Sequence, residues 1–124
     1  MTSTSLPPAD LCCAPLGEGP LSSADAIQLA TAFKAIADPA RLRLLSLIAD
    51  QPGGEACNCE LVAPLGLSQP TVSHHLKVLH DAGLLTRERR SQWAFYRIVP
   101  ERLAALRDAL VLGAGVPADN KVHQ

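Results

Sequence analysis

Two predicted helices within residues 59–83 are joined by a tight turn at LGLS. The first helix, CELVAPL, is closed by Gly66, and the second begins after Ser68, whose hydroxyl can cap it, with Pro70 in the first turn. The second helix runs to Gly83, a residue type that commonly ends helices. Its apolar face consists of Val72, Leu76 and Leu79, with Val78 beside them. This spacing is typical of a helix-turn-helix, in which the turn fixes the second helix across the first.

Proline and glycine residues divide the rest of the chain into further elements. We expect residues 1–20 to form a flexible arm, residues 21–113 to form one domain, and residues 114–124 to form a disordered tail. Within the domain, the sequence predicts a helix over 23–37, a helix from Pro39 to the DQPGG stretch, a β-hairpin over 84–99 that turns at Arg90–Gln92, and a last helix over 100–112.

Apolar residues recur at helical spacing in three of these helices and define the faces that we expect to be covered. They are Ile27, Ala30, Phe33 and Ala37; Leu42, Leu45, Ile48 and Ala49; and Leu103, Leu106 and Leu110. The stripes of the first and last helices are too apolar for a small domain to leave in water. We therefore expect a dimer that persists at micromolar concentration.

The order helix, helix, short helix, turn, helix, hairpin, helix is that of a winged helix-turn-helix, a mainly α fold with a β-hairpin wing (α+β). The composition agrees, because 124 residues suit one domain, and 48% hydrophobic with only 3% aromatic residues favours aliphatic helices. No apolar run approaches the roughly 18 residues that cross a bilayer, and the N-terminus does not fit a signal peptide. We therefore expect a cytoplasmic protein, without membrane association, whose thiols stay reduced.

The charge is distributed unevenly although the net charge is −1. Residues 1–60 carry seven acidic and three basic residues, which gives −4, whereas residues 71–97 carry five basic and two acidic residues, which gives +3. A local basic excess on the second helix and the hairpin indicates double-stranded DNA as partner. The helix offers donors and acceptors for phosphates and base edges: Ser68, Gln69, Thr71, Ser73, His74, His75 and Lys77. The hairpin adds Arg87, Arg89 and Arg90 as candidate wing contacts.

Four cysteines occur in two pairs, Cys12 and Cys13 in LCCAP, and Cys57 and Cys59 in EACNCEL. A buried cysteine is commonly an inert apolar residue, and this alternative stays open for the second pair taken singly. It does not account for the first pair, whose segment has no core pattern and whose exposed thiols carry an oxidation risk. A ligand or redox role is therefore favoured for Cys12 and Cys13.

The segments FKAIADPARLRLLSLI, LGLSQPTVSHHLKVLHDAGLL and WAFYRI resemble the ArsR/SmtB family of metal-sensing transcriptional repressors. The resemblance covers about residues 25–110. It implies a homodimeric winged helix, built on the first and last helices, that binds an operator with dyad symmetry and leaves it when a metal ion or metalloid binds. It also implies that the polar residues from Ser68 to His75 lie on the DNA-reading helix and that Arg87–Arg90 lie on the wing.

The same resemblance places the Cys-x-Cys pair at the start of the third helix, where many members carry a soft-ion site. Some members bring thiolates from an N-terminal arm to that helix, sometimes from the other subunit. Soft thiolates select soft ions, and three sulfurs in a pyramid suit As(III). The resemblance thus implies As(III), with Sb(III) next, as an inducer bound by Cys12, Cys13, Cys57 and Cys59, and no organic cofactor. Helical residues i and i+2 point about 200° apart, so the last two can share an ion only in the first turn. Cys57 is the better candidate for the third ligand.

Other functions or sites differ from this one in the residues they require. A repressor that senses Cd(II) or Pb(II) would use all four cysteines, and a redox-sensing repressor would form a disulfide between the arm and the third helix. An enzyme is rejected because the chain has no Cys-x-x-Cys and no βαβ pattern. A zinc site on the last helix is rejected because ERLAALRDALVLG has no histidine, and His80 is interpreted as a surface residue. A DNA-packaging role would leave the arm cysteines unexplained.

Overall fold

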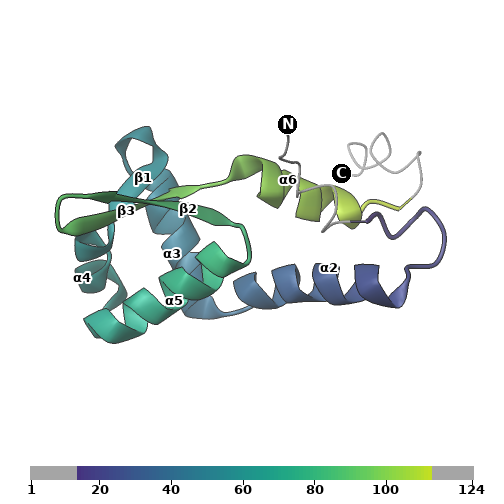
Figure 1. Cartoon of the computed structure of the whole chain (residues 1–124), viewed down its shortest axis with the longest axis horizontal. Helices are drawn as coiled ribbons and strands as arrows, with labels where there is room; N and C mark the ends of the chain where they lie inside the picture. Colours follow the sequence, from purple (N-terminus) through teal and green to yellow (C-terminus); the bar gives the residue numbers. More distant parts are fainter. Residues whose placement is uncertain (1–13, 113–124) are drawn as a thin grey trace, which may run out of the picture. The chain divides into compact units, whose positions relative to one another are not determined.

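The structure is a computed structural model that describes residues 14–112. Figure 1 shows its elements, which confirm the predicted mainly α fold with a β-hairpin. In chain order they are α2 (Ser23–Ile36), α3 (Pro39–Asp50), the 3-10 turn η2 (Pro52–Gly54), β1 (Glu55–Cys57), the 3-10 turn η3 (Asn58–Glu60), α4 (Val62–Leu65), α5 (Gln69–Asp81), β2 (Leu85–Arg90), β3 (Trp93–Ile98) and α6 (Pro100–Ala109). Most of the predicted arm and the predicted tail lie outside the described residues.

The described chain divides into two compact units, one formed by residues 14–31 and 101–112 and the other by residues 32–100. In the first unit, Leu29 of α2 and Leu106 of α6 are buried, as is Ala109. The N–H of Leu16 donates to the carbonyl of Ala109 at 3.0 Å, so the chain before α2 is attached to the end of α6. Whether residues 21–113 act as one domain stays a prediction.

The second unit combines helices α3, α4 and α5 with a three-stranded antiparallel sheet of order β1-β3-β2. The hairpin β2–β3 turns at Ser91, whose φ of 60° allows the tight reversal, at the predicted position. One face of the sheet carries Ala56, Tyr96 and Ala94, all buried. The fully buried side chains of this core are Leu44, Ile48, Leu61, Val72, Leu76, Leu79 and Leu84. The predicted core face of α5 is therefore confirmed.

Two side-chain caps fix where the central helices begin. The carboxylate of Asp38 accepts hydrogen bonds from the N–H groups of Ala40 (3.0 Å) and Arg41 (3.2 Å) at the start of α3. The hydroxyl of Ser68 accepts from the N–H of Thr71 at the start of α5. The hydrogen bond from the Arg41 N–H, more than any other interaction, lowers the pKa of Asp38 below its ordinary value.

Asp38→Ala is expected to lower the thermal unfolding midpoint by a few degrees at neutral pH, because the first N–H groups of α3 lose their acceptor. A carboxylate with a lowered pKa stabilises the fold above its ordinary value of 3.8 and loses that effect as the pH falls through the lowered value. The difference between the variant and the unmodified chain should therefore shrink in acid. Calorimetry at several pH values measures it, with Asp50→Ala at the other end of α3 as control. An equal loss in both variants would contradict the role of the cap.

Three expectations about elements were wrong in detail. The third helix does not begin at the Cys-x-Cys pair, because Cys57 ends strand β1 and residues 58–60 form η3 before α4. The last helix ends at Ala109 rather than at 112. Leu42, expected on the covered face of the second helix, is 53% exposed, while its neighbour Leu44 is buried. In α2, Leu29 is buried and Ile27 is 66% exposed, on the stripe for which a dimer is expected. Several apolar stripes coexist on these helices, so periodicity alone did not identify the buried one.

Candidate DNA interface and thiol pair

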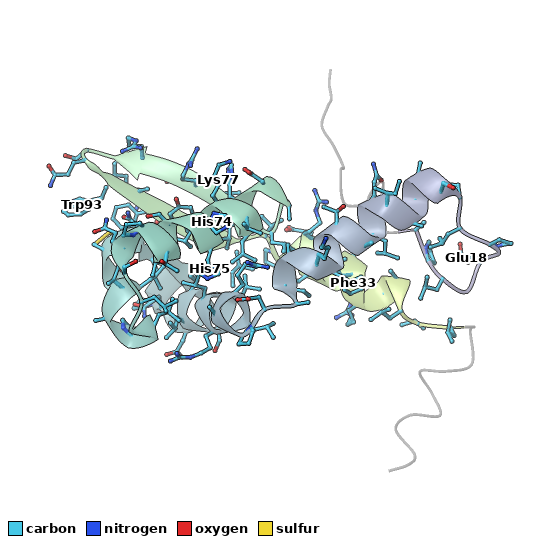
Figure 2. All side chains as sticks on the ribbon, turned by 90° about the horizontal axis from the view of Figure 1, so that it is seen from below. Glu18, Phe33, His74, His75, Lys77 and Trp93 are labelled. Atoms are coloured by element: carbon cyan, nitrogen blue, oxygen red, sulfur yellow. A yellow bond between two sulfur atoms is a disulfide. The ribbon has the colours of Figure 1, made fainter. Side chains whose placement is uncertain are left out.

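Helix α5 presents a polar side away from its buried residues. Gln69, Thr71, His74 and Lys77 are exposed, and Ser73 is half-buried. Figure 2 labels His74, His75 and Lys77 along this helix. Amide, hydroxyl, imidazole and ammonium groups on an exposed helix after a tight turn are the donors and acceptors that contact base edges and phosphates.

Four of the predicted DNA-contacting residues, on this helix or at its N-cap, also bind within the protein. Ser68 donates to the Thr71 hydroxyl at 2.9 Å in addition to capping α5. The Nδ1 atom of His75 lies 3.2 Å from the Arg41 guanidinium, which also donates to the Ala35 carbonyl at 2.6 Å. Lys77 pairs with Asp81 at 2.7 Å. These contacts hold the start of α5 and its side toward α3 in place.

The wing arginines differ in their surroundings. Arg87 and Arg89 on β2 are exposed, and no ion pair within residues 14–112 involves either of them. Arg90 is instead held by two carboxylates, at 2.6 Å from Glu55 and 2.8 Å from Glu88. The hydrogen bond to Glu88 is the main cause that raises the pKa of Arg90, and it lowers the pKa of Glu88. Arg87 and Arg89 are thus the wing cations most available to phosphates.

Cys57 and Cys59 meet at the junction between the sheet and the helix-turn-helix. Their sulfur atoms are joined as a disulfide, visible as a yellow bond in Figure 2. Cys57 ends β1 and is 3% exposed, whereas Cys59 is exposed in η3. Cys57 is the N-cap of the 3-10 turn η3, and Cys59 is the second residue of that turn, so the two sulfurs meet at a turn and not within an α-helix. Whether they share an ion stays a prediction.

Backbone and side-chain contacts fix this pair. The N–H of Cys57 donates to the Glu60 carboxylate at 2.8 Å, and the N–H of Cys59 donates to the Cys57 sulfur at 3.2 Å. Cys12 and Cys13 lie outside the described residues. Within 14–112 no cluster of three or more His, Cys, Asp or Glu side chains is placed to hold a metal ion.

Sequence reasoning missed the residues around Arg90. Glu55 and Phe95 contact this wing arginine, and Arg97 binds the same Glu55 carboxylate. The contact between Arg41 and His75 was missed as well. The chain gave few signals for these contacts, because Glu55 stands 42 residues from Arg97 and lies in a strand of only three residues.

Comparison with known proteins agrees with this geometry. A sequence profile described as bacterial regulatory protein, arsR family, matches residues 38–87. The arsenic resistance transcriptional regulator ArsR1 of Pseudomonas putida is 49% identical over 69 residues, which cover 56% of this chain and 52%, about half, of that protein. The crystal structure of the AntR antimony-specific transcriptional repressor is 34% identical, with a TM-score of 0.60, covering 85% of this chain and 89% of that one.

A homodimeric winged helix-turn-helix DNA-binding domain from Mycobacterium bovis, a possible ArsR-family regulator, superposes with a TM-score of 0.58 at 26% identity. The superposition covers 72% of this chain and 83% of that domain. A tight helix-turn-helix followed by an arginine-rich hairpin defines a winged helix-turn-helix DNA-binding protein. The chain belongs to the arsR family of bacterial regulatory proteins, which are DNA-binding transcriptional regulators and not enzymes. Within the described residues, no helix has the length and apolar character needed to cross a membrane.

Proposed function

We propose that this chain is a homodimeric transcriptional repressor whose operator complex is released when As(III) binds its cysteine thiolates. The observation that carries the proposal is the meeting of the Cys57 and Cys59 sulfurs directly before the helix-turn-helix. An ion held there lies at the start of η3, which leads through α4 to α5. Ion binding can therefore act on the DNA-reading helix over a short distance along the chain.

The identity of the proposed inducer ion depends on how many cysteine sulfurs bind it. A trivalent arsenic atom takes three thiolates. Cys12 and Cys13 supply two of them, and reduced Cys57 supplies the third, with Cys59 beside it. Sb(III) has the same coordination, and the similarity to an antimony-specific repressor makes it the next candidate inducer. Cd(II) or Pb(II) would draw on all four sulfurs.

Titration of the reduced chain with As(III), Sb(III), Cd(II) and Pb(II) tests the choice of ion. Thiolate–ion absorption and operator binding should be followed in the same samples. We expect As(III) and Sb(III) to change both signals with a stoichiometry of one ion per subunit. If thiolate–ion absorption and operator release responded only to Cd(II) or Pb(II), the inducer would be a divalent ion and not a metalloid.

The operator is proposed to be double-stranded DNA with dyad symmetry, read by α5 and contacted by the two wings of a dimer. Exposed polar residues of α5 face the major groove, while Arg87 and Arg89 bind phosphates of the flanking backbone. A two-fold symmetric protein requires two half-sites in opposite orientation, about one helical turn apart.

The dimer is expected to form through the apolar surface of α2 and α6. Ile27 is 66% exposed, Leu110 53% and Leu112 57%. Light scattering should give a mass of about 26 kDa, twice the 13.1 kDa of the chain, at micromolar concentration. Ile27→Glu with Leu110→Glu should shift the mass toward the monomer, whereas Leu42→Glu, on an equally exposed residue of α3, should not. A monomeric mass for the unmodified chain would contradict the dimer.

A redox-sensing repressor is the second candidate, and the Cys57–Cys59 disulfide favours it. In that function hydrogen peroxide oxidises two thiols to the disulfide and is reduced to two waters. The switch would then lie within the Cys-x-Cys pair and would need no arm cysteine. Release of the operator by peroxide in the absence of As(III), retained in a Cys12→Ser, Cys13→Ser chain, would establish this function instead.

A further inference from the structure

One face of the sheet carries both Cys57 of the thiol pair and Arg90 of the wing. Side chains alternate along a strand, so Glu55 and Cys57 of β1 lie on the face opposite the buried Ala56. Their register partners on β3, Arg97 and Phe95, lie on that same face. Cys57 is directly opposite Phe95, and Glu55 is directly opposite Arg97.

Arg90 crosses this face from the far strand. It leaves β2 at the hairpin turn, and its guanidinium lies over the Phe95 ring, 4.5 Å from the centroid. Its Nη2 atom then reaches the Glu55 carboxylate at 2.6 Å. Arg97 binds the other oxygen of Glu55 at 3.0 Å. The tip of the wing is thereby connected to the strand that ends in Cys57.

Two carboxylates hold Arg90, but only one of them joins different strands. Glu88 lies on β2, two residues before Arg90, so this pair stays within the wing. Glu55 lies on β1, two residues before Cys57, and its carboxylate is 20% exposed, against 66% for Glu88. The less exposed pair with Glu55 is screened less by water and salt. It is the contact that spans the sheet.

We propose that Glu55 is a positioning residue that couples the thiol pair to the wing through Arg90. The inference rests on the proposed function and names the route of its regulation. With β1 undisturbed, Glu55 holds Arg90 and keeps the wing oriented for DNA. An ion on the Cys57 sulfur displaces the end of this three-residue strand, draws the Glu55 carboxylate away from Arg90 and loosens the wing. DNA affinity falls because the ion-bound form disfavours the wing orientation that the operator requires.

The sole tryptophan of the chain provides a readout of the wing that is independent of DNA. Trp93 begins β3, is 41% exposed and pairs in register with Arg90. Its emission should change when As(III) binds the reduced full-length dimer, because the cation beside it is released. Glu55→Gln should lose most of this change, whereas the matched control Glu88→Gln, which removes the same charge from the same arginine, should keep it.

Operator affinity gives the second measurement. The ratio of dissociation constants with and without As(III) should be about 2- to 30-fold smaller in Glu55→Gln than in the unmodified chain, and unchanged in Glu88→Gln. Circular dichroism confirms that both variants are folded. The coupling would be overturned if Glu55→Gln, shown by absorption to bind As(III), kept the full Trp93 response and the same ratio of operator dissociation constants as the unmodified chain. The proposed function would remain intact in that case. A Trp93 response that requires Glu55, in a chain whose operator complex As(III) does not release, would support the coupling and overturn the proposed function.

Discussion

Replacing both arm cysteines, Cys12→Ser with Cys13→Ser, is expected to abolish release of the operator by As(III) while leaving operator affinity within about twofold. An inducer shifts binding only through its different affinity for the free and DNA-bound forms, a coupling that typically amounts to about 5- to 150-fold. Two sulfurs remain in the double variant, and they do not complete a three-sulfur site. We expect the double variant to fold, because within residues 14–112 the buried side chains between Leu29 and Ala109 already form a core.

Fluorescence anisotropy of a labelled operator measures this effect, with a phosphine reductant that does not compete as a thiol. Single Cys57→Ser and Cys59→Ser variants complete the set, and we expect the larger loss from Cys57→Ser. Thermal unfolding and light scattering serve as controls that the fold and dimer are unchanged. If the double variant released the operator at the As(III) concentration that releases the unmodified repressor, the arm would have no role, and sensing would belong to the Cys-x-Cys pair alone.

Removing the two wing arginines that make no ion pair within residues 14–112, Arg87→Ala with Arg89→Ala, is expected to weaken operator binding on the order of 100-fold near physiological salt. Each arginine on a phosphate releases counterions and contributes about one unit to the slope of log affinity against log salt. A dimer loses four such contacts, so the slope should become less negative by about 3–4 units. Arg90 is left in place because Glu55 and Glu88 already hold it.

Salt titrations of operator binding provide the measurement, and Arg107→Ala provides the control. Arg107 is 73% exposed on α6, away from the wing in sequence, so its removal changes net charge without removing a wing contact. An unchanged slope in the wing variant, or an equal change in the control, would show that the hairpin does not bind the DNA backbone.

Signals contained within one element predicted most of this fold. The starts of α3 and α5 were predictable from Asp38 before Pro39 and from Ser68 before Pro70. In each case the capping side chain and the N–H groups that it binds are at most three residues apart. The apolar face of α5 was predictable because most of its other positions are polar, which leaves Val72, Leu76 and Leu79 as the stripe for the core. The position of the hairpin turn was predictable for the same reason, because the polar residues that indicate it lie at the turn itself.

Features that depend on distant partners were not predictable. Strand β1 has three residues and is stabilised by β3, about 40 residues later, so its own sequence shows no alternation to recognise. Helix α3 contains Leu42, Leu44, Leu45 and Leu47, which cover several sides, and only packing selects the buried ones. Counting charges treated Arg90 as a free cation, although the fold pairs it with Glu55.

The most direct test of the account is release of the unmodified, reduced dimer from its operator as As(III) is added, followed by anisotropy and thiolate–arsenic absorption in one titration. We expect the anisotropy to fall and the absorption to rise together, saturating at one As(III) per subunit. Removal of the ion by a competing dithiol should restore binding. An operator complex that persists while the absorption shows the thiolates occupied would contradict the proposal that As(III) is the inducer.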